Sequence, residues 1–179
     1  MQAPEHTVVL RECRAVQIPE GTPALLSPGT RVRITQSLGG TYTVATDRGY
    51  LLRIDSRDAD AIGKSPHDLL GEVAGSPLDE QVWALLKTCY DPEIPINIVD
   101  LGLVYNCEVL ERPEGGRRVD VKMTLTAPGC GMGPVLAQDV KDKLERLPGI
   151  DAADVEIVFD PQWNQNMMSE AARLELGLF

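Results

Sequence analysis

The sequence predicts an α+β chain built from two unlike parts, and three observations lead to this prediction. Short runs of alternating apolar residues, separated by glycine turns, fill the first third of the chain. After residue 76, apolar residues at helical spacing alternate with strand-like runs. Between these parts, glycines and a proline interrupt any long period. We therefore expect a small all-β N-terminal domain, barrel- or sandwich-like, over residues 1–62, a linker over 63–76 and a compact α/β domain over 77–179.

The strands expected in the first part follow one another through tight turns. Residues 7–10 are a β-rich run, and apolar residues share one face in each of the runs 31–35, 42–44 and 50–54. Glycines after residues 38 and 48 supply the turns between them. Prolines at positions 19, 23 and 28 indicate a surface loop. Nothing in this part forms a catalytic constellation.

The second part is predicted to contain helices. Ser76 is the expected N-cap of the first helix and Pro77 its first residue, and an apolar stripe follows. That stripe ends at Cys89, for which we expect a place in the core. A second stripe, at 136, 140, 144 and 147, ends at Pro148-Gly149. A short C-terminal helix is expected within 167–176.

Three strands are expected between these helices. They cover residues 103–109, 119–125 and 155–159, where apolar and polar residues alternate. Cys107 falls on the apolar face of the first of them, so packing is its expected role. These strands and helices together predict the mixed architecture of the second part.

Composition limits the classes of function. Net charge is −10, which argues against nucleic-acid binding because an acidic chain repels phosphate backbones. Mean hydropathy is −0.12 and no long apolar run is present, so no membrane span is expected. The first residues lack the basic start and apolar core of a signal peptide. We therefore expect a cytoplasmic protein.

The cysteines and histidines do not form a metal-binding motif in the sequence. The four cysteines are Cys13, Cys89, Cys107 and Cys130, and no two are separated by only two residues. Both histidines lie far from all four in sequence. A closed Cys/His metal site within one chain is therefore not expected, and the cysteines are expected as free thiols.

Residues 123–134, Met-Thr-Leu-Thr-Ala-Pro-Gly-Cys-Gly-Met-Gly-Pro, are the most informative stretch of the chain. A strand runs into a Pro-Gly turn, presents Cys130 and is followed by a helix. Unpaired N–H groups and the helix dipole stabilise a thiolate at such a position. Cys130 is therefore the first candidate for chemistry. The alternative is that the turn only joins a strand to a helix.

Three segments of the second part together resemble one known family. They are 91–105, beginning Asp-Pro-Glu-Ile-Pro, then 123–134, and finally Asp-Pro-Gln-Trp at 160–163 with Met-Met-Ser-Glu-Ala-Ala-Arg at 167–173. The chain is similar in these segments to the iron–sulfur cluster assembly domain found in SufT-like proteins. The same domain occurs in the PaaD subunit of a phenylacetyl-CoA oxygenase system and in the eukaryotic cytosolic iron–sulfur targeting adaptor.

The resemblance implies a functional site and a cargo. The family's acidic motif falls on Asp91 and Glu93, and its Thr…Cys motif falls on Thr126 and Cys130. The implied cargo is a transiently bound iron–sulfur cluster, with Cys130 as the metal ligand. Three roles remain open for the carboxylates: binding iron, accepting a proton from Cys130, or capping a helix. Many members have proline after the cysteine, whereas this chain has Gly131.

The function implied by the resemblance is maturation of iron–sulfur proteins, as an adaptor or transient carrier and not as an enzyme. One cysteine cannot hold a cluster that needs about four ligands, so the other ligands must come from a second subunit, a partner, a small thiol or the carboxylates. Expected partners are iron–sulfur scaffold or carrier proteins and client apo-proteins, and homo-oligomers remain open. The alternatives are a purely structural interaction module and a thiol enzyme, which the distant histidines disfavour. Trp163, Met167 and Met168 form either a partner-binding patch or part of the core.

Overall fold

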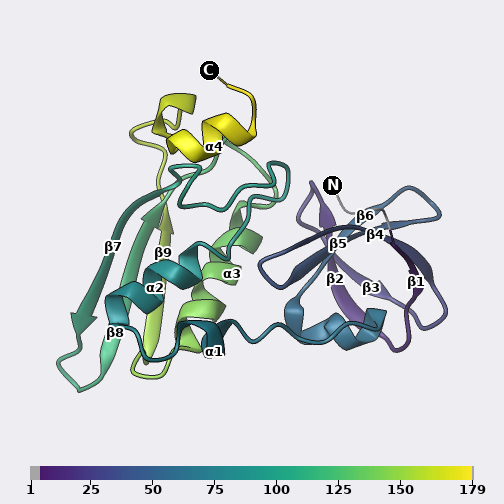
Figure 1. Ribbon diagram of the computed structural model, residues 1–179, viewed down its shortest axis with the longest axis horizontal. Coiled ribbons are helices and arrows are strands. Elements are labelled where there is room, and N and C mark those ends of the chain that lie inside the picture. The colour runs from purple at the N-terminus through teal and green to yellow at the C-terminus, as the bar shows by residue number, and fades with distance from the viewer. Residues whose placement is uncertain (1–4, 179) are drawn as a thin grey trace. The chain divides into compact units, whose positions relative to one another are not determined.

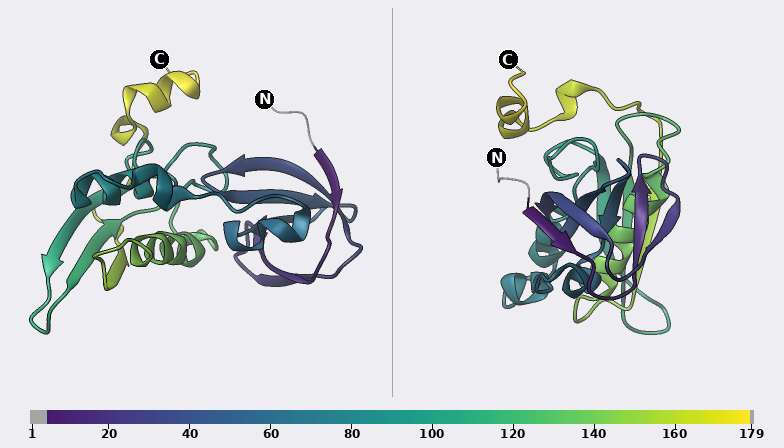
Figure 2. Two further views of the ribbon diagram at one scale, coloured as in Figure 1. Left: turned by 60° about the horizontal axis from the view of Figure 1, so that its bottom comes forward. Right: turned by 90° about the vertical axis from the view of Figure 1, so that its right-hand side faces the viewer.

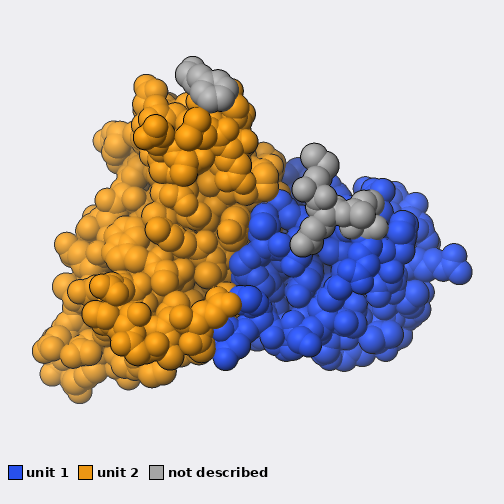
Figure 3. Space-filling view, in the orientation of Figure 1, with its two compact units in different colours: residues 1–68 blue, residues 69–179 orange. Residues whose placement is uncertain are grey.

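The computed structural model describes residues 5–178, and the chain has a mixed α+β fold. Its contacts divide it into two compact units, unit 1 with residues 1–68 and unit 2 with residues 69–179 (Figure 3). Each unit has its own cluster of buried apolar side chains. Among the described residues, no helix has the length and apolar character needed to cross a membrane.

Unit 1 is a single antiparallel sheet of six strands, in the order β1-β4-β5-β6-β2-β3 (Figure 1). The strands are β1 (Glu5–Val8), β2 (Cys13–Ile18), β3 (Pro23–Leu26), β4 (Arg31–Leu38), β5 (Thr41–Thr46) and β6 (Leu51–Ile54). Alternate residues of β4, β5 and β6 face the core, where Val44 and Ile54 are fully buried. One curled sheet, and not two packed sheets, therefore encloses this core.

Three features of unit 1 differ from the sequence-based expectation. Strand β2 lies in a stretch for which no strand is predicted. The proline-containing stretch includes strand β3, which begins at Pro23 on an edge of the sheet. Proline is tolerated there because an edge strand's first residue need not donate to a neighbour. A 3₁₀ helix, η1 (Ser56–Ile62), follows the sheet, with Asp55 accepting from the Arg57 N–H at 2.9 Å and Gly63 closing it at φ 74°.

The stretch expected as a linker, residues 63–76, contains a one-turn helix, α1 (Leu69–Val73). Leu69 is buried and packs in the apolar cluster of unit 2. The apolar pair Leu69-Leu70 explains this helix, because its burial outweighs the neighbouring glycines.

Unit 2 packs two helices against one face of a three-stranded sheet (Figures 1 and 2). Strands β7 (Val104–Glu111) and β8 (Arg117–Met123) are antiparallel, and β9 (Ala152–Ile157) lies parallel to β8. Helix α3 (Gly133–Glu145) connects β8 to β9, and α2 (Leu78–Leu86) precedes the sheet. The chain ends in η2 (Gln165–Met167) and α4 (Glu170–Glu175). The buried face of β8 carries Val119, Val121 and Met123, as the alternation predicts.

The start of α2 differs from the expected one. Pro77 is the N-cap, with extended backbone (φ −53°, ψ 148°), and no side chain caps the helix. Ser76 lies outside it, and its carbonyl accepts a hydrogen bond from Gln81 Nε2 at 2.6 Å. The apolar stripe is as predicted: Val82, Leu85 and Leu86 are buried in the core.

Candidate functional site

The three family-like segments meet at one end of the unit 2 sheet because of its topology. β7 runs antiparallel to β8, and β9 runs parallel to β8. The residues before β7, those after β8 and those after β9 therefore all emerge at the same end, where Figure 1 also shows α4. This end is called the motif end below, and it is formed by residues 91–103, 124–132 and 158–169.

Main-chain hydrogen bonds continue the sheet into the motif end. The Thr124 N–H donates to the Leu103 carbonyl at 2.8 Å, which joins the first segment to the second. The Val158 N–H donates to the Met123 carbonyl at 2.8 Å, which joins the third segment to the second. The second segment is thus held from both sides just before it reaches Cys130.

The third segment is also fastened directly to the first. Trp163 Nε1 donates to the Leu101 carbonyl at 2.7 Å, and the Tyr105 hydroxyl donates to the Pro161 carbonyl at the same distance. The Ser169 N–H donates to the Asp100 carbonyl at 2.8 Å. Residues 56 to 69 positions apart in the chain therefore form one framework.

Gly102 permits the close approach of the first and third segments. A Cβ on this residue would lie 2.1 Å from the Met167 carbonyl oxygen, and its φ of 76° lies in the left-handed region. Both facts exclude a side chain here without a shift of the backbone. Glycine at this position is thus a structural requirement of the motif end.

Cys130 lies between the end of β8 and the start of α3, as the sequence predicts. Its carbonyl accepts a hydrogen bond from the N–H of Gly133, the first residue of α3, at 3.1 Å. No side chain caps α3, and Pro134 lacks an N–H group. The Cys130 side chain is half-buried and packs against the edge of the unit 2 core. The thiol is therefore neither enclosed in the interior nor fully in solvent.

The turn before Cys130 requires a glycine at position 129. Gly129 has φ 75°, whereas Gly131 does not have a positive φ. The left-handed residue of this turn is therefore Gly129. Gly131, which replaces the proline of many family members, does not have this conformation.

The two threonines beside the turn have different surroundings. Thr126 is half-buried. Thr124 is 1% exposed, and its hydroxyl oxygen has no hydrogen-bond partner among the described residues. A buried hydroxyl without a partner is uncommon in native proteins, so the motif end contains one unsatisfied polar group.

Asp91 and Glu93 share a turn but face different surroundings. Asp91 is 7% exposed, and its Oδ1 accepts hydrogen bonds from the N–H groups of Glu93 at 2.9 Å and Ile94 at 3.0 Å. Burial raises the pKa of the Asp91 carboxyl, and the two N–H donors partly offset this increase. The Glu93 side chain is exposed. Asp91 therefore stabilises its own turn. Of the three roles left open for the carboxylates, this is closest to capping a helix.

Cys89 and Cys107 have the packing surroundings expected from the sequence, and Cys13 is also buried. Cys89 is 1% exposed and lies in the unit 2 core, and Cys13 is 3% exposed in the core of unit 1. Cys107 packs against the unit 2 core, where burial and the nearby Asp79 and Glu108 charges raise its pKa to about 11. Within residues 5–178, no group of three or more His, Cys, Asp or Glu side chains is placed to hold a metal ion.

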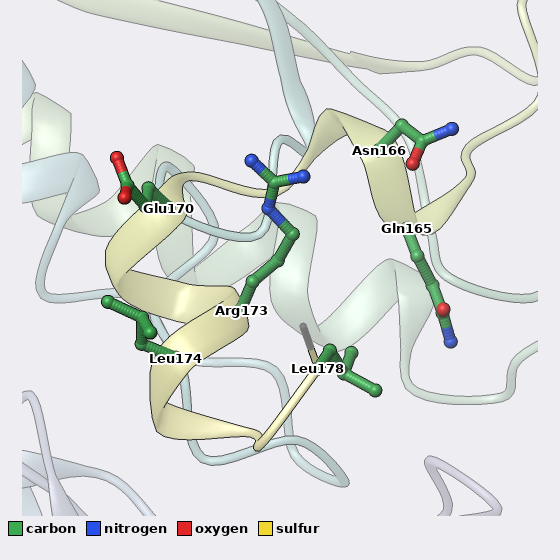
Figure 4. Close-up of a pocket in the computed structure, with 6 residues that line it drawn as sticks. All are labelled: Gln165, Asn166, Glu170, Arg173, Leu174 and Leu178. Carbon is green, nitrogen blue, oxygen red and sulfur yellow. The ribbon is translucent and has the colours of Figure 1, made fainter.

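The C-terminal segment contains residues of the unit 2 core as well as residues that line a hollow on the surface. Met168 is 5% exposed in the core and Trp163 packs partly against it, which favours core packing for these two residues. A hollow of about 340 Å³ is lined by residues of η2 and α4 and by Leu178, and Figure 4 shows how these side chains lie. Leu174 and Leu178 give this hollow an apolar side, while Glu170 and Arg173 give it charge.

The fold of unit 2 and its motif end define the class of protein. The model of a family described as "Iron-sulfur cluster assembly protein" matches residues 79–157, which lie entirely in unit 2. The chain belongs to this iron–sulfur cluster assembly family, as the resemblance predicted.

The chain is similar to relatives that consist of little more than this domain. It is 44% identical over 99 residues to the "Fe-S protein maturation auxiliary factor" of Porphyromonas gingivalis, covering 55% of this chain and 90% of that protein. It is 47% identical over 88 residues to the "Fe-S protein maturation auxiliary factor SufT" of Staphylococcus aureus, covering 49% and 96%. A crystal structure of a domain of unknown function from Bacillus anthracis is 32% identical, with a TM-score of 0.50, and the match covers 57% of this chain and 93% of that one.

Sequence reasoning missed the residues that build the framework of the motif end. Gly102, Tyr105 and Trp163 lie inside the quoted segments, yet their partners are far away in the sequence. Asn97 is a further example, because its Oδ1 accepts from the N–H groups of Val99 and Asp100. Of these features, only the turn at Asn97 could have been predicted from the sequence, because asparagine side chains often accept hydrogen bonds from the backbone two residues further on.

Proposed function

We propose that the chain is a maturation factor for iron–sulfur proteins, which acts as an adaptor or transient carrier of clusters through Cys130. The observation that carries this proposal is the convergence of the three family segments at the motif end, one of which contains Cys130. The names of the relatives support the same role.

The ligand count supports transient binding over a permanent centre. Common clusters are held by about four protein thiolates, and the described residues offer no such set. Cys130 is only half-buried at the motif end, so metal-ligating side chains of a partner can reach it. The cluster is thus cargo, with Cys130 from this chain and the remaining ligands from a scaffold or client protein.

The neighbouring site residues have supporting roles in this proposal. Thr126 orients the sulfur or a turn amide, and Asp91 fixes the turn that presents the exposed Glu93 carboxylate. Glu93 is the carboxylate of the pair that a partner or a metal ion can reach. We also propose that residues 1–62 form a separate all-β domain, because unit 1 has its own sheet and core.

A thiol enzyme fits the structure less well than a carrier. Both histidines, His6 and His67, lie in residues 1–68, so unit 2 has no imidazole to pair with Cys130. We propose that the chain does not catalyse a reaction of its own and that it works within the cytoplasm.

Anaerobic reconstitution tests the carrier role. Wild type, Cys130→Ala and the matched control Cys107→Ala are incubated with iron, sulfide and a small thiol, then analysed for iron, sulfide and visible absorption. Transfer to an apo-dehydratase of the [4Fe–4S] class is then followed by its recovered activity. We expect Cys130→Ala to lose cluster uptake and transfer, and Cys107→Ala to retain both. Equal uptake and transfer by all three proteins would contradict the carrier role.

The adaptor role has a different readout. Co-purification from cells is compared for wild type, Cys130→Ala and Glu93→Gln, with quantitative mass spectrometry of the captured proteins. Iron–sulfur scaffold or client proteins are expected with wild type and at reduced levels with the variants. Unchanged capture by both variants, together with full complementation by Cys130→Ser in a deletion strain, would favour the purely structural module.

A further inference from the structure

The sheet of unit 1 remains open, and a hollow of about 510 Å³ lies along its β3 side. β1 and β3 stand at the two ends of the strand order, so neither edge is closed by the other. The hollow is lined by β3, the start of β4 and the turn from β5 to β6. Its volume is within the range of pockets that bind ligands in proteins.

The hollow has an apolar floor and a partly apolar rim. Leu26 and Leu52 are each 5% exposed and face inward, whereas Leu25 and Tyr50 are 58% and 52% exposed. Large apolar side chains gathered beside a hollow are typical of interaction surfaces. The β3 groove is defined here by these four residues together with Arg31 and Arg48.

Within residues 5–178, no strand pairs with the edge of β3 that faces away from β2, so this backbone edge is free beside the groove. It pairs with β2 so that Ala24 is opposite Ala15, and the Gln17 N–H donates to the Thr22 carbonyl at 2.8 Å. Hydrogen-bonded and non-hydrogen-bonded pairs alternate in an antiparallel ladder, so the Leu25 N–H and C=O point away from β2. Such an edge accepts a further strand, as in complexes formed by strand addition.

The charges at the groove favour an acidic partner. Arg31 and Arg48 make no ion pair and no side-chain hydrogen bond with any residue of 5–178. By contrast, Arg11 is held by Asp58 and Asp60, at 2.9 and 2.6 Å. The lining residues include one acidic side chain, Asp47, so the groove has a net positive charge.

We propose that the β3 groove binds an extended segment of a partner protein, in which apolar side chains alternate with acidic ones. The segment adds to the free edge of β3 through main-chain hydrogen bonds at Leu25. Its apolar side chains cover Leu26 and Leu52, and its carboxylates pair with Arg31 and Arg48. This role does not depend on Cys130, so it stands apart from the proposed function.

The geometry favours this occupant over two others. A second copy paired edge to edge through β3 would bring each arginine near its own equivalent, because such a contact repeats the same surface. A compact small molecule would leave the Leu25 N–H and C=O without partners. An extended acidic segment satisfies the backbone edge, the apolar floor and the two arginines together.

Fluorescence anisotropy with the full chain tests the proposal. The probe is a fluorescein-labelled peptide of about ten residues with alternating valine and glutamate. A lysine-for-glutamate peptide and a backbone N-methylated peptide serve as controls for charge and for strand addition. Saturable binding is expected for the first peptide alone.

Matched variants locate the binding site. Arg48→Glu is compared with Arg33→Glu, which makes the same charge change at an exposed residue outside the groove. We expect Arg48→Glu to weaken binding at least about tenfold and Arg33→Glu to change it less than about twofold. Amide NMR shifts are expected at Leu25, Arg48 and Tyr50.

Three results of the peptide experiments would overturn the proposal. They are equal binding of the lysine peptide, equal weakening by Arg33→Glu, and peptide-induced shifts confined to unit 2. Sedimentation of the chain alone is a further test. A dimer that is abolished by Arg48→Glu would also overturn the proposal, because it would assign the groove to a second copy. A circular dichroism spectrum equal to wild type confirms that each variant is folded.

Discussion

Unit 1 and unit 2 differ in where charge and chemistry are concentrated. Residues 1–68 contain eight basic and eight acidic residues, whereas residues 69–179 contain nine basic and nineteen acidic ones. The whole net charge of −10 therefore belongs to unit 2, which also carries the motif end. Unit 1 is neutral and keeps an open sheet edge. The proposals above assign cluster handling to unit 2 and partner binding to unit 1. The four predictions below test the structural differences between the units, in order of decreasing effect.

The largest effect is expected at Gly102. Gly102→Ala places a Cβ 2.1 Å from the Met167 carbonyl in a left-handed backbone, so unit 2 should lose about 4 kcal/mol of stability. Gly149→Ala is the matched control, since Gly149 has φ 94° but nothing within 4 Å of its Cβ position. The control should lose about 1 kcal/mol. Urea unfolding followed by tryptophan fluorescence measures both, and equal losses would contradict the close approach.

The second prediction tests whether the units unfold independently. Ile54 is fully buried in unit 1, so Ile54→Ala should destabilise that unit by about 3 kcal/mol. Both tryptophans, Trp83 and Trp163, lie in unit 2. The variant should therefore show a circular dichroism transition with a midpoint at lower urea concentration. The midpoint of the tryptophan fluorescence transition should stay unchanged.

Leu85→Ala is the counterpart in unit 2 and should move the tryptophan transition. If Ile54→Ala moves the tryptophan transition by the same amount, the two units unfold as one, and the proposed domain division is wrong.

The third prediction compares the cysteines of the two units. Cys107, with its pKa raised to about 11, should be alkylated about 100-fold more slowly at pH 8 than a free thiol. Cys13 and Cys89 are buried and should also react slowly. Cys130 should react first. Timed iodoacetamide labelling with peptide mass spectrometry measures the order, and faster labelling of Cys107 or Cys13 would contradict the assignment of Cys130 as the accessible thiol.

The smallest effect is expected at Asp91 and depends on pH. Burial raises the pKa of this carboxyl in the folded protein, so its charged form is disfavoured there. Wild type should therefore gain stability relative to Asp91→Asn as pH falls through the folded-state pKa. The gain should level off below the unfolded-chain value of about 3.9. Urea titrations of both proteins from pH 3 to 7 measure this difference, and a constant difference would contradict it.

The local elements of unit 2 were largely predictable, whereas the arrangement of the site was not. The stripe from Leu136 to Leu144 predicted α3, and the alternation from Val119 to Met123 predicted β8. The inward orientation of Asp91 was not predictable, because it depends on the N–H groups of its own turn. The missed strand β3 shows a similar limit, since proline reads as a loop signal unless the strand is known to be at an edge.

The sequence alone determined the main helices and strands of unit 2, that Cys130 lies between a strand and a helix, and that the chain resembles an iron–sulfur assembly family. These properties are local, because side-chain periodicity and turn residues act over a few neighbouring positions. Only the tertiary structure decided that residues 91–103, 124–132 and 158–169 meet at one end of a sheet, and that the sheet of unit 1 stays open beside β3. Strand order and register depend on packing between residues far apart in the chain, and no short stretch of sequence encodes them.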